Sequence, residues 1–142
     1  MGTVRQILET KGSQVWTITP DKTVFEALRI MGEKEVGALV VVNGGRVTGI
    51  ISERDYARKV ILQGKTSRDT LVLEIMTSPA LVTQPQQTVQ ECMSVMTDHR
   101  IRHLPVVDNE QLVGMISLGD LVKSIIDEQQ FKIAQLENYI GS

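Results

Sequence analysis

The sequence predicts an α+β fold made of two tandem copies of one β-α-β-β-α unit, followed by a C-terminal helix. The chain repeats itself at an offset of 65 residues, and each copy alternates amphipathic helices with strands rich in β-branched residues. The composition is that of a globular protein. Of the 142 residues, 42% are hydrophobic and 23% are charged, which excludes a disordered chain and a fibrous repeat.

The repeat is visible without a gap between residues 20–55 and 85–120. Of these 36 aligned positions 12 are identical, whereas average composition gives about 2 by chance. The identities include Gly49 with Gly114, Ser52 with Ser117 and Asp55 with Asp120. The match extends upstream through Leu8 with Leu73. The chain therefore holds two copies of one ancestral unit.

Each copy predicts the same order of elements. An extended segment comes first, then a helix that opens at a threonine, then two strands joined by a tight turn, then a second helix. Asn43-Gly44 is a strong hairpin signal, and Asp108-Asn109 is a weaker equivalent. The expected ranges are 15–19 and 80–83 for the extended segments, 36–42, 47–51, 101–107 and 112–116 for the strands, and 53–62 and 118–126 for the second helices.

These ranges divide the chain into residues 1–66 for the first repeat with its N-terminal segment, 67–126 for the second repeat, and 127–142 for a terminal amphipathic helix. One copy is small for an independent core, so we expect the two to pack about a pseudo-twofold axis. The apolar stripe of the terminal helix includes Phe131, Leu136 and Ile140. It packs either on its own domain or across a dimer, and the sequence leaves both open.

The charge balance and the single cysteine restrict the expected partners and the expected cellular location. Fifteen basic residues against 17 acidic ones give a net charge of −2, so nucleic acid is not an expected partner. The longest apolar run, residues 38–42, is too short to span a membrane, and the N-terminus carries no secretory signal. Cys92 has no partner for an intrachain disulfide, which favours a cytoplasmic location.

The most informative motif lies where the second strand of each copy meets the second helix. It reads Gly49-Ile-Ile-Ser-Glu-Arg-Asp55 and Gly114-Met-Ile-Ser-Leu-Gly-Asp120. Glycine permits a close approach, the helix start favours an anion, and a carboxylate three residues after the serine can accept hydrogen bonds from ribose hydroxyls. Ser-x-x-Asp is equally a capping box that only starts the helix. The motif alone is compatible with both.

Together with the β-α-β-β-α order, these motifs and the strands at 36–42 and 101–107 make the chain resemble a cystathionine-β-synthase (CBS) domain pair, or Bateman module, over residues 4–126. The resemblance implies a regulatory protein that binds adenosine-containing ligands in the clefts between its repeats. It also implies no catalytic activity and dimerisation through the helices.

The resemblance assigns site residues position by position. Asp55 and Asp120 would hold ribose hydroxyls, with Ser52 and Ser117 meeting ribose or phosphate. Each cleft would take its adenine wall from the other repeat, so that Asp120 pairs with Val36, Gly37 and Ala38, and Asp55 pairs with Ile101, Arg102 and His103.

Arg54, Arg102 and His103 would surround the Asp55 cleft with positive charge, whereas their counterparts Gly119, Gly37 and Ala38 are neutral. We therefore expect phosphate-bearing ligands at the Asp55 site.

The prediction is a stand-alone signalling module that binds AMP first, with ADP, ATP and NAD as further ligands, and that forms a homodimer acting on an unknown protein. No catalytic cofactor, metal ligand set or nucleophile is expected, and Cys92 is expected in the core. The alternative is a ligand-free interaction module that serves as a dimerisation scaffold. Protection from heat by nucleotides separates the two.

Overall fold

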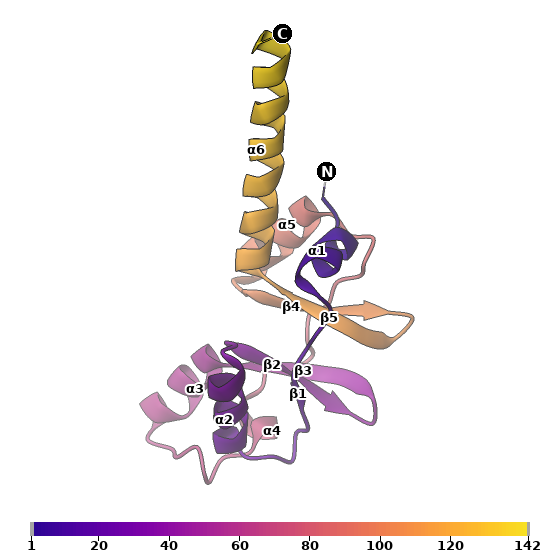
Figure 1. Ribbon diagram of the computed structural model, residues 1–142. Helices are drawn as coiled ribbons and strands as arrows, with labels where there is room; N and C mark the ends of the chain where they lie inside the picture. Colours follow the sequence, from indigo (N-terminus) through magenta and orange to yellow (C-terminus); the bar gives the residue numbers. More distant parts are fainter. Residues whose placement is uncertain (1, 142) are drawn as a thin grey trace. The chain divides into compact units, whose positions relative to one another are not determined.

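The computed structural model describes residues 2–141, and Figure 1 shows its helices and strands. The elements, in chain order, are α1 (Val4–Lys11), β1 (Thr17–Ile18), α2 (Val24–Lys34), β2 (Ala38–Asn43), β3 (Arg46–Ser52), α3 (Glu53–Lys59), the 3₁₀ helix η1 (Ile61–Gln63), α4 (Val72–Ile75), α5 (Val89–His99), β4 (His103–Asp108), β5 (Gln111–Ser117) and α6 (Leu118–Gly141). The predicted α+β class is confirmed, and both copies contain the predicted helix, hairpin and second helix. The first extended segment forms β1 in one copy, whereas in the other it forms only the parallel bridge of Thr83 with Val106.

The chain forms two compact units. The first contains residues 2–13, 82–108 and 113–141, and the second contains residues 14–81 with the turn at 109–112. The N-terminal segment thus belongs to the unit of the second repeat, although the sequence analysis groups it with the first. In the first unit, Val4 N–H donates to Gln87 O at 2.9 Å and Arg5 N–H to Pro85 O at 2.9 Å.

In the second unit, α4 makes the backbone hydrogen bonds that correspond to those of α1 in the first unit. Val72 N–H donates to Lys22 O at 2.8 Å and Leu73 N–H to Pro20 O at 3.1 Å, and these acceptors are the repeat equivalents of Gln87 and Pro85. Since α1 precedes the first repeat and α4 precedes the second, each unit is completed by the helix that leads into the other repeat. The local sequence pattern does not predict this exchange.

The sheet of the second unit has the order β1-β2-β3, with β1 parallel and β3 antiparallel to β2. The first unit holds the two-stranded sheet β4-β5. The turns lie one residue later than predicted. Gly44 and Gly45 have φ of 60° and 81°, and Asn109 and Glu110 have φ of 50° and 65°. A two-residue hairpin turn of the primed type needs positive φ at both central residues, and two glycines adopt it at the least cost.

Each unit has its own apolar core. In the second unit, α2 buries Val24, Ala27 and Met31 against the sheet residues Leu39, Val41 and Ile51. In the first unit, α5 buries Val89, Cys92 and Met96 against Leu104, Val106 and Ile116. Cys92 therefore lies in the core, as predicted, and burial raises the pKa of its thiol. An unreactive structural thiol is the consequence.

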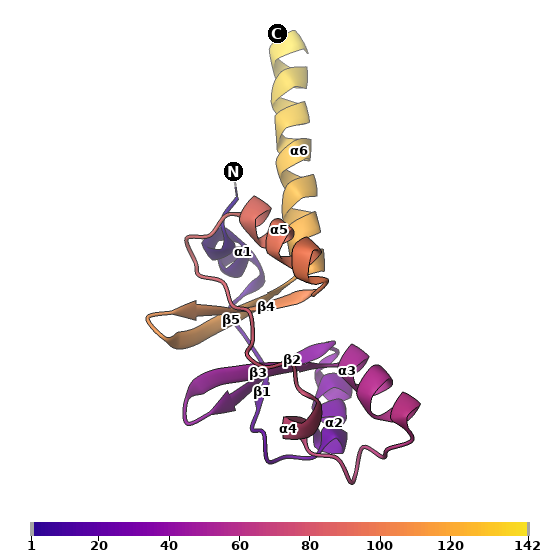
Figure 2. The ribbon, with the colours of Figure 1, turned by 180° about the vertical axis from the view of Figure 1, so that it is seen from behind.

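Two predicted helix ends differ from the structure. The helix expected to reach residue 62 ends at Lys59 and continues only as η1. The helix expected to end at residue 126 runs to Gly141 as the single 24-residue α6, because residues 121–140 contain neither glycine nor proline. Figures 1 and 2 show α6 without a break, its C-terminal part extending beyond α1 and α5 of its own unit. Within residues 2–141, no helix is both long and apolar enough to cross a membrane.

The motif glycines permit close packing, which gives a first prediction. A Cβ on Gly49 would lie 2.7 Å from the backbone oxygen of Thr77, whereas one on Gly32 would meet no atom within 4 Å. Gly49→Ala should therefore lower the free energy of unfolding by about 1–3 kcal/mol through overpacking. Gly32→Ala, the control in α2, should raise it by about 0.5–1 kcal/mol through helix propensity. Urea unfolding measures both, and a Gly49→Ala variant as stable as the parent chain would contradict the packing.

Candidate ligand-binding site

The first copy of the serine-aspartate motif forms a complete capping box. Ser52 is the last residue of β3 and the N-cap of α3, and its Oγ accepts from Asp55 N–H at 3.2 Å. In return, Asp55 Oδ2 accepts from Ser52 N–H at 2.9 Å and from Ser52 Oγ at 3.1 Å. The capping role that the sequence left open is therefore present. Capping also fixes the carboxylate at the junction of strand and helix.

The carboxylate of Asp55 is buried, with 9% of the residue exposed. Its second oxygen, Oδ1, lies 3.1 Å from Lys59 Nζ and accepts from Thr77 Oγ1 at 3.4 Å. Lys59 Nζ also donates to Ile75 O at 2.9 Å. A buried charge is costly unless it is paired and hydrogen-bonded, and these contacts meet that need. A ribose hydroxyl that binds Asp55 must therefore replace one of these internal partners.

The second copy, in the first unit, repeats the cap but is more open. Asp120 Oδ2 accepts from Ser117 N–H at 2.8 Å, and Ser117 Oγ accepts from Asp120 N–H at 3.2 Å. Lys11 Nζ binds the same Oδ2 at 2.7 Å and also donates to Met115 O at 2.9 Å. The Asp120 side chain is 24% exposed. Partial burial favours a higher pKa for Asp120, but the bonds from Lys11 and Ser117 outweigh it and lower the pKa, so the group is ionised at neutral pH.

The lysines that neutralise the two carboxylates do not occupy equivalent positions. Lys59 lies one turn further along the helix of its own carboxylate, whereas Lys11 comes from α1. At the offset of 65 residues their counterparts are Ser124 and Met76, neither of which carries a charge. Sequence reasoning missed both lysines, because an internal repeat points only to residues that it preserves.

The predicted adenine-wall residues lie beside the helix start of their own repeat. Gly37 O accepts from Glu53 N–H at 3.1 Å, and Arg102 O accepts from Leu118 N–H at 2.8 Å. Ala38 is paired with Ser52 in the register of β2 and β3. The structure thus brings residues 36–38 to Ser52 in one unit and residues 101–103 to Ser117 in the other. The pairing of each wall with the carboxylate of the other repeat remains a prediction.

A groove of about 700 Å³ lies in the first unit at the N-terminal part of α6. Arg102 and His103 form part of its wall together with Ser117, Gly119 and Lys123. Burial of His103 lowers its pKa below the ordinary value of 6.5, so its ring is neutral at pH 7. His103 therefore offers hydrogen bonds. Arg102 and Lys123 bring positive charge to the groove, and Asp127, whose Oδ2 lies 3.9 Å from Lys123 Nζ, brings a negative charge. The neutral ring differs from the sequence analysis, which counted His103 as a cation.

Two further titratable residues, Arg54 and His99, lie on helices. Arg54 is the second residue of α3 and is half-buried. His99 Nδ1 lies 3.1 Å from Val95 O, within its own helix. In the described part of the chain, no group of three or more His, Cys, Asp or Glu side chains is arranged to hold a metal ion.

Comparison with known proteins identifies the repeats. The CBS domain model matches residues 4–62 and 72–127. A solved protein with CBS domains from Burkholderia ambifaria MC40-6 is 51% identical, with a TM-score of 0.86 over 89% of this chain and 96% of that chain. The mitochondrial CBS domain-containing protein CBSX3 of Arabidopsis thaliana is 40% identical over 97% of this chain and 71% of its own length.

A third similar protein was solved with ligands. The CBS domain pair of protein MJ0100 is 25% identical, with a TM-score of 0.80 over 90% of this chain and 98% of that chain. Its crystal structure is a complex with 5′-methylthioadenosine and S-adenosyl-L-methionine.

The contact between Lys11 and Asp120 predicts a specific dependence of stability on pH. Because Asp120 has a lower pKa in the folded chain than its ordinary 3.8, its contribution is complete above that value and is lost as the pH falls through the folded-state pKa. Lys11→Met, which copies the residue at the equivalent position of the other repeat, should lower the free energy of unfolding by about 0.5–1 kcal/mol at neutral pH.

The difference between Lys11→Met and the parent chain should shrink as the pH falls below 3.8 and vanish once the pH is below the folded-state pKa of Asp120, where the group is protonated in both states. Urea unfolding at a series of pH values measures it. Lys65→Met, at an exposed lysine outside this contact, is the control and should show no such trend. A loss of stability for Lys11→Met that is equal at all pH values would contradict the ion pair.

Proposed function

Because this chain belongs to the CBS domain family, we propose that it is a regulatory module that binds adenosine-containing ligands and signals to another protein. The observation that carries the proposal is the duplicated junction at which Ser52 and Ser117 hold the carboxylates of Asp55 and Asp120 at a helix start. Carboxylates fixed in this way are suited to accept hydrogen bonds from the paired hydroxyls of a ribose. The adenosine compounds named with the MJ0100 pair support the same ligand class.

Only a few polar groups would recognise the adenosine half of the ligand. Ribose hydroxyls would donate to Asp55 or Asp120, and the backbone and apolar side chains of residues 36–38 and 101–103 would enclose the adenine. Such sites are mostly apolar with a small number of placed polar groups. AMP is the proposed first ligand, with ADP, ATP and NAD sharing the same half. No catalytic step is assigned to the chain.

We propose Arg102 as the main phosphate contact, acting with Arg54 at the Asp55 site as the sequence predicts. Arg102 is exposed, and a guanidinium binds phosphate through two parallel hydrogen bonds. His103 is neutral at pH 7 and would contribute a hydrogen bond. The regulated protein is unknown. We further propose that the chain forms a homodimer and works in the reducing cytoplasm. The buried Cys92 would remain a thiol there.

A second candidate function is a ligand-free interaction module. The observation that favours it is that Asp55 already uses both carboxylate oxygens on internal partners, and Asp120 is paired with Lys11. In that case the motif is only a pair of helix caps. The two candidates make opposite predictions for nucleotide binding.

Thermal unfolding with AMP, ADP, ATP, NAD and S-adenosylmethionine separates the two functions. At a hundredfold excess over Kd a ligand adds about 2.7 kcal/mol, which should raise Tm by roughly 5–10 °C for a chain of this size. Asp55→Asn and Asp120→Asn keep an acceptor for the cap but lose the charge, and we expect one or both to abolish the rise. Asp98→Asn, at an exposed carboxylate in α5, is the control. If none of the compounds raises Tm, the binding function is excluded and the ligand-free interaction module is the function that remains.

Titration calorimetry tests the phosphate contact. Arg102→Ala should weaken AMP binding about tenfold or more, the value of a charged hydrogen bond, and should leave adenosine binding unchanged. Arg29→Ala, at an exposed arginine of α2, is the control. Combining Arg102→Ala with Asp55→Asn should give a non-additive loss. Non-additivity with Asp120→Asn instead, or an equal loss for adenosine and AMP, would contradict the assignment.

A further inference from the structure

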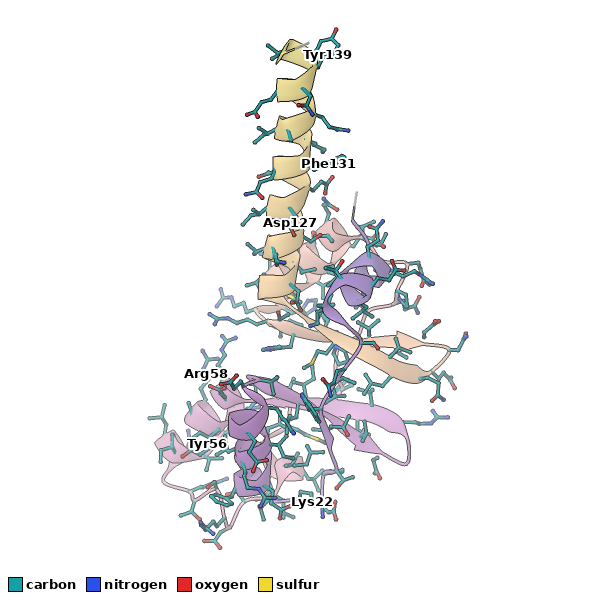
Figure 3. All side chains as sticks on the ribbon, in the orientation of Figure 1. Lys22, Tyr56, Arg58, Asp127, Phe131 and Tyr139 are labelled. Atoms are coloured by element: carbon teal, nitrogen blue, oxygen red, sulfur yellow. The ribbon has the colours of Figure 1, made fainter. Side chains whose placement is uncertain are left out.

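The outer part of α6 is apolar and has no cover within the described residues. Ile126, Ile133, Leu136 and Ile140 are 46%, 55%, 61% and 81% exposed. In Figures 1 and 2 this part of α6 extends beyond the other elements of its unit, and Figure 3 shows side chains on all sides of it. A helical segment of this length is marginal in water without tertiary packing. A second surface is therefore expected to cover it.

The exposed apolar side chains are not an extension of the face that packs on the unit. Leu121 is buried in the core of the first unit, and Ile125 packs against that core. Val122 follows Leu121 and Ile126 follows Ile125, so each lies roughly a quarter of a helical turn further around the helix. Val122 is 41% exposed and Ile126 is 46% exposed. The helix thus uses one stripe for its own core and presents a neighbouring stripe for another contact.

This second stripe, which we call the α6 seam, consists of Val122, Ile126, Gln129, Ile133, Leu136 and Ile140. The spacings alternate between four and three residues, which is the heptad pattern of a coiled coil. The three a positions are all isoleucine: Ile126, Ile133 and Ile140. Leu136 occupies a d position. β-Branched residues at a with leucine at d favour two parallel strands. Gln129 is the one polar residue of the seam and occupies a d position.

The charges beside the α6 seam also fit a parallel pair. Lys132 takes a g position and Glu137 the following e position. In a parallel, in-register pair, g faces the e position five residues later in the partner, so that Lys132 meets the partner's Glu137 twice. Within one chain Lys132 Nζ lies 3.4 Å from Glu128 Oε1, and the two side chains are 65% and 28% exposed. Such a surface pair contributes little and is readily exchanged.

We propose that α6 of one chain pairs in parallel with α6 of a second copy, forming a two-stranded coiled coil along the α6 seam. The apolar seam supplies the affinity, and the pairs between Lys132 and Glu137 set the direction. Phe131 takes the f position on the opposite side of the helix and lies outside the contact, although it is 63% exposed. Val122 and Ile126 also line the groove that has Arg102 on its wall, whereas Gln129, Ile133, Leu136 and Ile140 lie outside it, so variants at these outer positions test the pairing apart from ligand binding.

Sedimentation equilibrium of the full chain tests the pairing with a matched pair of variants. Ile133→Glu and Phe131→Glu each place one negative charge on an exposed apolar position of the same helix, at 55% and 63% exposure. We expect a dimer for the parent chain, a dimer of unchanged Kd for Phe131→Glu, and at least a tenfold higher Kd for Ile133→Glu. A monomeric parent chain, or equal effects of the two variants, would overturn the proposal.

Disulfide crosslinking under mild oxidation tests the direction of the pair. Gln129→Cys and Leu136→Cys both occupy d positions, so in a parallel pair each meets its own copy within disulfide reach. We expect both to form covalent dimers, and Phe131→Cys to form none. The native Cys92 is 2% exposed, so the parent chain serves as a blank. In an antiparallel pair at most one d position lies opposite its own copy, so at most one of the two variants could form a covalent dimer. A covalent dimer of only one variant, or of neither, would refute the parallel arrangement.

Discussion

The junction between strand and helix is the constraint on which both units depend. In the second unit, Ser52 ends β3, pairs with Ala38 of β2 and caps α3, while Gly37 O takes the N–H of Glu53. One short segment therefore fixes the hairpin register, the start of the helix and the position of the Asp55 carboxylate. The first unit repeats the arrangement with Ser117, Arg102 O and Asp120. Because the cap is made by atoms of the chain itself, it orients the carboxylate in advance, which would reduce the ordering that the proposed ligand binding requires.

The same junction carries different charge partners in the two units. Asp55 is buried and neutralised by Lys59 of its own helix, whereas Asp120 is more open and is neutralised by Lys11 of α1. Under the proposed function, a ligand hydroxyl would displace a different set of contacts at each place. The duplicated backbone carries two junctions of unequal chemistry, and the difference comes from residues outside the repeated motif. A module of the proposed kind would then respond differently to ligands that share one adenosine half.

The features predicted from sequence are those written in local patterns. The identities at an offset of 65 residues predicted the order of elements, and the threonines that cap α2 and α5 marked where these helices begin. The exchange of α1 and α4 could not be predicted, because it depends on where the chain crosses between units. Lys11 and Lys59 have no charged counterpart in the other copy, so the repeat did not point to them, and the neutral state of His103 follows from burial. The continuity of α6 could have been predicted, since residues 121–140 contain no helix breaker.

The central claim is that the capping carboxylates receive the ribose of an adenosine ligand. Amide-resolved NMR of the ¹⁵N-labelled chain during titration with AMP tests it most directly, because the N–H groups of Ser52 and Ser117 donate to those carboxylates. The account predicts concentration-dependent shifts at Ser52 with Asp55, at Ser117 with Asp120, or at both, while the amide of Phe131 stays in place. Saturable AMP binding that leaves all four junction amides unmoved would contradict it.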